Sequence, residues 1–496
     1  MLRLLSMITA LTLVLTPAAR AEQVLRMAHD LGFGASTTMD PYDPNRFWPT
    51  INIVYEGLIA LTSDNQPIPR LATEWSSSPD LKTWTFKLRD GVTFHDGSAF
   101  DAADVAFSFN RMIDKEFDSP VRAVLGVISE IKVVDPLTVE FHLSAPEADF
   151  LLLVGDYRAM ILPEGMTGEM AKTAPVGTGP FKVETLSPEG TTVLAAFPEF
   201  HGGAPKLARI EMSAIPDSSA RIQALLAGQI DMLATIDSKQ EPLFAGNPQF
   251  VLQHIPSGDW NAIVFQVDQK PFDDVRVRKA LRMAVDREEM VKILLGEGNG
   301  VPACDTPVWS RDANRWDGTC PRDVEGAKKL LAEAGYPDGI DIEIFTSDVE
   351  ENMVQIVEVY QAQVAEAGIR VKLTMTASDG FWDTVWMQKP AFVDSWGQRP
   401  ATQVLNEVYR STASWNVSNW KVPEFDAMLD KARAEPDAAK RKALYGEIQQ
   451  KLYEEGGILA PYHKTLLRVI SARIKGIEVP FTPDNIPWQN VEIADE

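Results

Sequence analysis

Strand-like and helix-like patterns alternate along almost the whole chain, and no flexible linker separates them. Apolar residues recur at every second position over residues 81–94, which predicts a hairpin that turns at Asp90-Gly91. A helical period follows over residues 219–226, and residues 341–375 have the pattern of a strand, a helix and a second strand. With 496 residues, the chain exceeds one ordinary domain. We therefore expect lobes joined by crossing strands, an arrangement suited to hinge closure around a ligand.

The N-terminal segment differs in composition from the rest of the chain. Arg3 precedes an apolar stretch over Leu4–Leu15, and Ala19-Arg20-Ala21 has the small-x-small pattern of a signal-peptide cleavage site. The apolar stretch is too short for a membrane span, which needs about 20 residues, and no later segment approaches that length. We predict a signal peptide over residues 1–21 and a periplasmic mature protein. No lipid anchor is expected, because no cysteine lies near the cleavage site.

Acidic residues outnumber basic ones, 70 to 47, which leaves a formal net charge of −23 at pH 7. Such a chain is repelled by the phosphates of nucleic acids and by anionic membrane surfaces. We therefore expect no nucleic-acid partner. We also expect a monomer that does not itself span the membrane.

The two cysteines, Cys304 and Cys320, lie in one loop-like stretch. In a protein bound for an oxidising compartment, two cysteines this close along the chain favour a disulfide over free thiols. Closing so short a loop stabilises a fold by about 3 kcal/mol. The sequence therefore predicts a Cys304–Cys320 bond.

Residue patterns that support catalysis, metal binding or a cofactor are missing from the sequence. The six histidines occur singly, with no pair or cysteine cluster at metal-ligand spacing. No nucleophile elbow or phosphate-binding loop is present. Acidic pairs such as Asp101 and Asp104 stand at helix starts, where carboxylates cap free amides. We predict that the protein is not an enzyme and has no catalytic residue, metal site or cofactor.

Tryptophan is abundant, with 12 residues in the chain. Aromatic rings outside core periodicity favour a ligand cleft. Trp396 is the strongest candidate because Arg399 follows three residues later, which places a rigid ring and a permanent cation together. The other loop aromatics are Phe47-Trp48, Trp260, Phe381-Trp382, Trp386, Trp415 and Trp420.

The segment Phe86–Arg111 begins Phe-Lys-Leu-Arg-Asp-Gly-Val-Thr-Phe-His-Asp-Gly and continues through Asp-Ala-Ala-Asp-Val-Ala-Phe-Ser-Phe. By this motif the chain resembles the family 5 extracellular solute-binding proteins, the peptide-type receptors of bacterial ABC importers. The resemblance covers essentially the whole mature chain. Its supporting motifs are Met39-Asp-Pro41 with Tyr55–Leu58, Pro175–Phe181, Pro271–Arg287, Ala327–Gly339 and Pro423–Leu429.

This resemblance implies an α/β fold with the two lobes of a periplasmic binding protein, type II-like and of the peptide-receptor class. The first lobe would comprise residues 22–270 and 470–496, including an extra subdomain over roughly residues 66–175, and the second lobe residues 271–469. It also implies a partner, a membrane-embedded ABC permease. Most of the motifs are structural, and His95 is expected on the solvent side of a turn.

The predicted ligand cleft centres on Arg399. Similar peptide receptors carry Trp-x-x-Asp at this place, where the aspartate pairs with the peptide's ammonium group, whereas this chain has Trp396-Gly-Gln-Arg399. A guanidinium repels an ammonium group and binds a carboxylate through a charge-assisted fork. The alternative is that Arg399 pairs with an internal acid. Further candidates from position alone, each equally able to lie in the core, are Phe33, Thr37, Trp260, Asn261 and Asn416.

We therefore predict an ABC importer's binding protein for a small peptide or peptide-like solute, such as an amino-acid conjugate or opine, that carries a carboxylate. One alternative keeps the receptor role with a nickel chelate as cargo. A second alternative is a secreted hydrolase, which would need an activated nucleophile or paired carboxylates. A third is a periplasmic chaperone or sensory partner built from the same two lobes.

Overall fold

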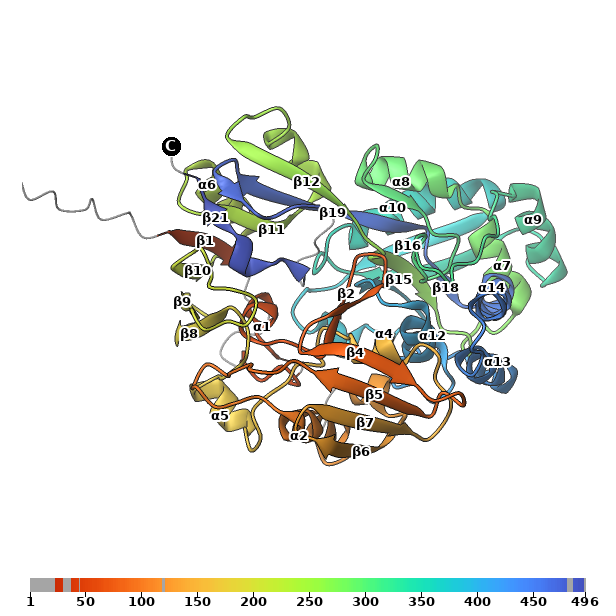
Figure 1. Ribbon diagram of the computed structural model, residues 1–496. Helices are drawn as coiled ribbons and strands as arrows, with labels where there is room; N and C mark the ends of the chain where they lie inside the picture. Colours follow the sequence, from red (N-terminus) through yellow and green to blue (C-terminus); the bar gives the residue numbers. More distant parts are fainter. Residues whose placement is uncertain (1–22, 30–36, 44, 118–120, 480–484, 495–496) are drawn as a thin grey trace, which may run out of the picture.

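The computed structural model describes residues 23–29, 37–43, 45–117, 121–479 and 485–494. The predicted signal peptide and Phe33 lie outside these ranges. Figure 1 shows two lobes side by side and a smaller sheet below the first lobe. In the described ranges, no helix is both long and apolar enough to cross a membrane.

The first lobe is built on a sheet of eight strands, in the order β12 (Phe250–Pro256), β19 (Tyr462–Ser471), β11 (Met232–Ile236), β1 (Val24–His29), β10 (Arg209–Ala214), β9 (Thr191–Ala196) and β8 (Phe181–Thr185), with β14 (Gly300–Pro302) paired to β19. β1 runs parallel to β10 and β11, whereas β19 is antiparallel to both of its neighbours in this order. Alternate residues of β1, Leu25 and Met27, are buried. The sheet thus joins the N-terminal strand to a strand close to the C-terminus (Figure 1).

The extra subdomain is a four-stranded sheet in the order β4 (Ala72–Ser77), β5 (Thr83–Leu88), β7 (Thr138–Leu143) and β6 (Ile128–Asp135), with helix α2 (Ala102–Ile113) packed on it. The predicted cap of α2 is confirmed, because Asp101 and Asp104 form a capping box. β6 pairs with β7 in antiparallel orientation. The hairpin predicted over residues 81–94 is wrong: β5 pairs with β4 and β7, and residues 92–94 enter a separate turn.

The second lobe is a sheet in the order β16 (Ile369–Met375), β15 (Ile340–Thr346), β17 (Ala391–Trp396), β13 (Trp260–Phe265) and β18 (Ile458–Leu459). β15 and β16 are parallel and are connected through α10 (Met353–Val364), which confirms the predicted strand, helix and strand. The other helices of this lobe are α7 (Val275–Met283), α8 (Arg287–Leu295), α9 (Val324–Glu333), α11 (Phe381–Thr384), α12 (Ala401–Tyr409), α13 (Pro423–Arg433) and α14 (Ala438–Glu455).

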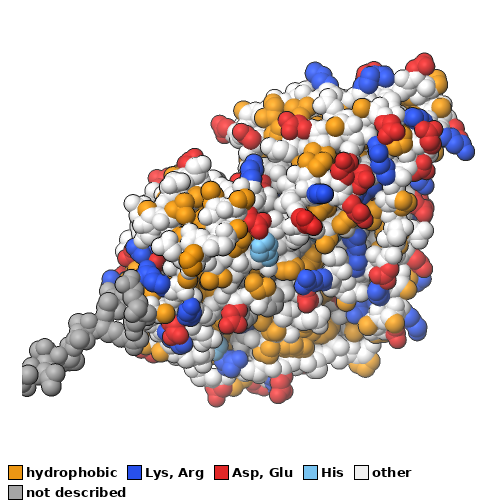
Figure 2. All heavy atoms as spheres, turned by 90° about the horizontal axis from the view of Figure 1, so that it is seen from above, with side chains coloured by type: hydrophobic (Ala, Val, Ile, Leu, Met, Phe, Trp, Pro, Cys, Tyr) orange, Lys and Arg blue, Asp and Glu red, His pale blue; other side chains and the backbone are white. Residues whose placement is uncertain are grey.

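Shorter elements complete the described chain. They are α1 (Trp48–Val54), β2 (Ile59–Leu61), β3 (Pro67–Pro69), α3 (Arg122–Leu125), α4 (Phe150–Val154), α5 (Gly168–Thr173), α6 (Ser218–Leu226), β20 (Ile474–Lys475) and β21 (Glu492–Ile493). Figure 2 shows one face of the molecule, on which basic and acidic side chains are interspersed. On this face the negative net charge is therefore not gathered into one acidic patch.

Two crossing connections join the lobes. The chain leaves the first sheet at Pro256 and enters the second at Trp260, and it returns between β18 and β19. The connections are bonded to each other, because the Lys464 amide donates to the Asp259 carbonyl oxygen at 2.7 Å. The first crossing precedes the predicted lobe boundary at residue 270, since the fully buried strand Trp260–Phe265 pairs with β17 in the second sheet.

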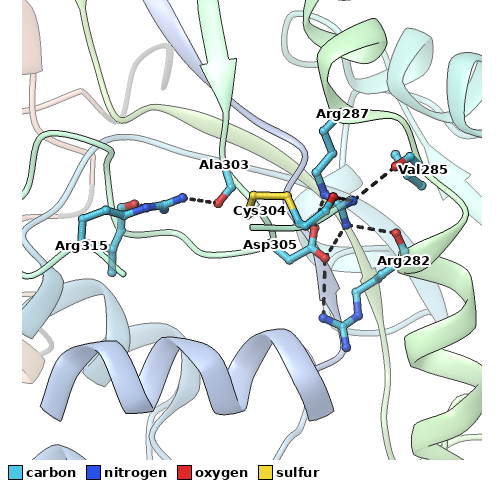
Figure 3. The surroundings of a disulfide bond; sticks show 9 residues. Arg282, Val285, Arg287, Ala303, Cys304, Asp305 and Arg315 are labelled. Carbon is cyan, nitrogen blue, oxygen red and sulfur yellow. Dashed lines mark hydrogen bonds and ion pairs between the residues drawn. A yellow bond between two sulfur atoms is a disulfide. The ribbon is translucent and has the colours of Figure 1, made fainter. Parts of the chain in front are cut away.

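The predicted disulfide Cys304–Cys320 is present in the second lobe. Figure 3 shows that it lies beside a buried ion pair, in which Arg287 Nη2 contacts Asp305 Oδ2 at 2.6 Å. Arg315 donates to the carbonyl oxygen of Ala303 at 2.7 Å. Covalent and ionic contacts thus fix the same loop.

The sequence predicts that His95 lies on the solvent side of its turn, and this prediction is wrong. Its Nε2 donates to the carbonyl oxygen of Gly179 at 2.9 Å, and its Nδ1 accepts the amide of Gly177 at 3.2 Å. Burial lowers the pKa of His95 to about 4. The neutral imidazole therefore fixes the glycine-rich loop, whose Gly179 amide in turn bonds to the Val54 carbonyl oxygen at the end of α1.

Candidate functional site: the cavity between the lobes

A cavity of about 620 Å³ lies where the two lobes and their crossing strands meet. The first lobe contributes α1, β2 and the loop over residues 155–157, and the second lobe contributes residues 397–400 and Gln403. Ser257 and Asp259 line it from the first crossing. Its volume falls in the range of about 300 to 1,000 Å³ that is usual for small-molecule sites.

Trp396, predicted to stack against the ligand, does not line the cavity, although the adjoining Gly397 does. Its side chain is only 7 % exposed and stacks on Trp260, with ring centroids 6.1 Å apart and planes inclined by 11°. Its Nε1 donates to Asp394 Oδ2 at 2.7 Å. Burial raises the pKa of Asp394 to about 6, although hydrogen bonds from two tryptophans oppose the rise. This aromatic layer therefore supports the wall of the cavity from behind.

The other position-based candidates also lie away from the cavity lining. Asn261 is fully buried and accepts a hydrogen bond from the Tyr462 hydroxyl at 3.1 Å. Asn416 is buried and bonds to both the amide and the carbonyl oxygen of Trp420. Thr37 is partly exposed and is not among the lining residues.

Arg399 does line the cavity, but its charge already has a partner. Its Nε lies 2.8 Å from Glu407 Oε2, which is the kind of internal acid considered as the alternative to ligand binding. Nη1 donates to the carbonyl oxygen of Gly397 at 3.1 Å. The guanidinium carbon is 4.8 Å from the centroid of the Trp396 ring, so the predicted neighbours are together.

Glu407 belongs to a buried ionic network that spans the two lobes. Arg158 of the first lobe forms a bidentate pair with Asp156, at 2.7 and 2.6 Å, and lies 3.4 Å from Glu407. Gln403 donates to Asp156 at 2.9 Å. Burial alone would raise the pKa of Asp156, but Arg158 outweighs it and holds that pKa below its ordinary value. With Arg399 included, two cations and two anions balance.

A second set of contacts joins the lobes outside this network. Glu147 is paired with Arg433, and Asp149 lies 3.1 Å from Arg441. Burial raises the pKa of Glu147 to about 7, against the attraction of Arg433. The amide of Ala148 also donates to the Arg433 carbonyl oxygen at 2.8 Å. The lobes are thus held together beside the cavity by charge pairs from the extra subdomain to α13 and α14.

Arg46 is a cavity-lining cation that the sequence analysis did not single out. Its Nη2 donates to the Tyr157 hydroxyl at 2.8 Å, and its guanidinium lies 5.1 Å from the centroid of that ring. Nη1 makes a long bond of 3.4 Å to the Asp43 carbonyl oxygen. Nε is buried without a hydrogen-bond partner, and no carboxylate among the described residues pairs with this arginine. Its sequence signal is the nearby Trp48, which was predicted in a loop but begins helix α1, and which also lines the cavity.

The remaining charged lining residues differ in how they are satisfied. Glu56 contacts His201 at 2.8 Å and accepts a hydrogen bond from Thr178 at 3.1 Å. Arg70 lines the cavity, and its side chain has no bonded partner among the described residues. Within the same part of the chain, no group of three or more histidines, cysteines or acids could hold a metal ion.

Two sheet-based lobes, joined by two crossing strands and enclosing a cavity at the junction, define a two-lobed solute-binding protein. Residues 66–419 match the model of the bacterial extracellular solute-binding proteins, family 5. The chain belongs to this family, whose members bind small ligands or peptides for ABC permeases and are not enzymes.

Similar proteins cover nearly the full length. The dipeptide-binding protein of Escherichia coli K12 is 29 % identical over 87 % of this chain and 86 % of its own. The glutathione-binding protein GsiB of Salmonella paratyphi A is 29 % identical over 84 % and 85 % of the two chains. The structure of MoaA from A. tumefaciens R10, in complex with mannopinic acid, has a TM-score of 0.80 and 25 % identity over 96 % of this chain and all of the other.

Proposed function

We propose that this protein is the periplasmic receptor of an ABC importer for a small peptide-like solute that carries at least one carboxylate. The solute binds in the cavity between the lobes and is delivered unchanged to a membrane-embedded permease. The observation that carries this proposal is Arg46, a cavity-lining cation without an acidic partner among the described residues.

Charge supports a carboxylate as the group bound there. Removing a cation from water without a counter-ion is costly, so a closing cavity that contains Arg46 favours a solute that supplies the anion. A guanidinium bonds a carboxylate through paired, charge-assisted hydrogen bonds. The dipeptide, glutathione and mannopinic acid named for the similar proteins are all carboxylates.

Arg46 is favoured over the other two arginines of the cavity. The charge of Arg399 is balanced by Glu407, so a ligand carboxylate there would compete with an existing ion pair. Arg70 has no bonded partner to fix its side chain, and ordering a free arginine costs up to about 2 kcal/mol of rotamer entropy. Arg46 is already held by Tyr157, which makes its orientation the most preorganised of the three.

A thermal-shift screen followed by calorimetry tests the proposal. The probes are reduced glutathione, mannopinic acid and alanyl-glutamate, and the matched control is alanyl-glutaminamide, in which amides replace both carboxylates. A bound probe at 100 times its Kd stabilises the protein by about 2.7 kcal/mol. We expect stabilisation by at least one carboxylate and none by the diamide. Equal stabilisation by the diamide, or none by any carboxylate probe, would contradict the proposal.

A further inference from the structure

We infer that Asp259 binds an ammonium group of the solute, so that the cargo is a zwitterion with its anion on Arg46 and its cation at the first crossing strand. This inference rests on the proposed function, because it concerns the same cavity. Asp259 follows Ser257 in the connection from β12 to β13 and lines the cavity.

One oxygen of the Asp259 carboxylate is fixed and the other is available. Oδ1 accepts the Ser257 hydroxyl at 2.6 Å and the Gln398 amide at 2.9 Å. Oδ2 receives no hydrogen bond from the described residues. Two donors on one oxygen set the plane of the carboxylate, and the second oxygen keeps its lone pairs for a donor that the protein does not supply.

Its charge is also unbalanced within the described part of the chain. No lysine, arginine or histidine there forms an ion pair with Asp259. In contrast, Glu56 and Asp156, which line the same cavity, contact His201 and Arg158. An acid that remains unpaired in a cavity closed by two lobes favours a cationic group on the solute.

The nearby guanidinium does not cancel this preference. Arg399 follows Gln398 directly in the chain, but its Nε pairs with Glu407, so its positive charge is already balanced. Arg46 and Asp259 are therefore a cation and an anion that line one cavity without an ionic partner in the described residues, and Arg46, unlike Arg70, is held in place by Tyr157. A solute with one ammonium and one carboxylate matches both.

Asp259 lies next to residues that form hydrogen bonds between the lobes. Its carbonyl oxygen accepts the Lys464 amide of the second crossing, and the neighbouring Gly258 amide donates to Gln398 Oε1 at 2.8 Å. Gln398 in turn donates to the Ser63 carbonyl oxygen of the first lobe at 3.0 Å. An ammonium on Oδ2 would therefore adjoin both crossings and one interlobe bond.

The test compares Asp259→Asn with the wild type in titrations with alanyl-glutamate and N-acetyl-alanyl-glutamate. The amide variant retains the Oδ1 acceptor, removes the charge and replaces Oδ2 by an NH2 group, which cannot accept from an ammonium group. Asp64→Asn is the matched control, because Asp64 is an exposed acid between the lining residues Ser63 and Asn65 that does not itself line the cavity. Melting temperatures without ligand verify that each variant is folded.

We expect the wild type and Asp64→Asn to bind the free amine at least 10-fold more tightly than the acetylated form, and Asp259→Asn to lose that preference. A variant that keeps the preference would overturn the inference. A wild type that binds both forms equally would also overturn it, while leaving the carboxylate proposal intact. If the wild type binds neither form, nor any carboxylate probe of the screen, both proposals fail.

Discussion

Two arginines, one from each lobe, line the same cavity and differ in how their charge is satisfied. Arg399 on the second lobe pairs with Glu407 at 2.8 Å and so joins the ionic network that connects the lobes. Arg46 on the first lobe bonds to a neutral phenol, that of Tyr157, and has no carboxylate partner in the described chain. The first arrangement holds the protein together, whereas the second leaves a cation for the solute.

This difference teaches that a charged residue beside an aromatic ring does not by itself identify a ligand contact. Arg399 lies 4.8 Å from the Trp396 ring, as the sequence suggested, but Glu407, whose Oε2 lies 2.8 Å from Nε, already balances its charge. The useful criterion is whether another residue of the protein already balances the charge. By that criterion we propose Arg46 of the first lobe as the anion-binding residue, whereas Arg399 of the second lobe belongs to the interlobe network.

The largest expected effect concerns the interlobe network. Arg158→Met leaves Asp156 and Glu407 buried without their shared cation, so the free energy of unfolding should fall by about 3 to 5 kcal/mol in denaturant titration. The control Arg410→Met removes an arginine that pairs with the exposed Asp430, and should cost less than about 1 kcal/mol. Similar losses in both variants would show that the network adds no more to the stability of the fold than an exposed ion pair does.

The pH dependence of stability distinguishes the loop fixed by His95 from the interlobe ionic network. The folded-state pKa of His95 is about 4, below the ordinary 6.5, so its contribution is present above pH 6.5 and is lost as the pH falls towards 4. The loss is at most about 3 kcal/mol. His95→Gln should remove this part of the slope when unfolding is measured at several pH values. Asp156, whose pKa is lowered, keeps its charge over most of this range.

If the slopes of the wild type and His95→Gln coincide between pH 6.5 and 4, the neutral imidazole does not fix the loop over Gly177 and Gly179. Such a result would remove the contrast between an acid-sensitive loop of the first lobe and the Asp156 carboxylate, whose pKa is lowered.

Direct substitution of the first-lobe cation comes next. Arg46→Gln should weaken binding of the best carboxylate probe by about 10- to 100-fold in calorimetry, since the ligand charge would lose its buried partner. Arg70→Gln, which removes a cavity-lining cation of the same lobe, should have a smaller effect. The assignment is wrong if the Arg70 variant loses more affinity than the Arg46 variant.

The smallest expected effect comes from the residue that positions Arg46. Tyr157→Phe removes the hydroxyl that accepts from Nη2 and keeps the ring, so affinity for the same probe should fall about 5-fold, the equivalent of one hydrogen bond. The control Tyr360→Phe loses a buried hydroxyl that donates to the Leu281 carbonyl oxygen at 3.0 Å, and neither residue lines the cavity. Equal affinities for wild type and Tyr157→Phe would show that this hydroxyl does not preorganise the cation.

Local patterns predicted much of the fold. The cap at Asp101 and the strand, helix and strand over residues 341–375 depend on neighbouring residues, and both are confirmed. The disulfide is confirmed for the same reason, because its cysteines are separated by only 16 positions. The predicted hairpin is wrong because β5 pairs with β7, a strand distant in sequence. Local patterns do not reveal such a pairing.

The cavity was harder to predict because its parts come from distant segments. Arg46 and Tyr157 are 111 positions apart, and Asp156 and Gln403 are 247 apart. Trp260 and Trp396 have the composition of a binding site, but β13 and β17 pair them face to face in the aromatic layer behind the wall. Which charge stays unpaired depends on such contacts. The sequence therefore predicts Arg399 as a candidate cation but does not identify Glu407 as its partner.

A crystal structure with the most strongly stabilising carboxylate probe tests the central claim most directly. The account predicts a probe carboxylate within hydrogen-bonding distance of the Arg46 guanidinium, while Arg399 remains paired with Glu407. A carboxylate bound to Arg399, with Glu407 displaced and Arg46 free of the ligand, would contradict it.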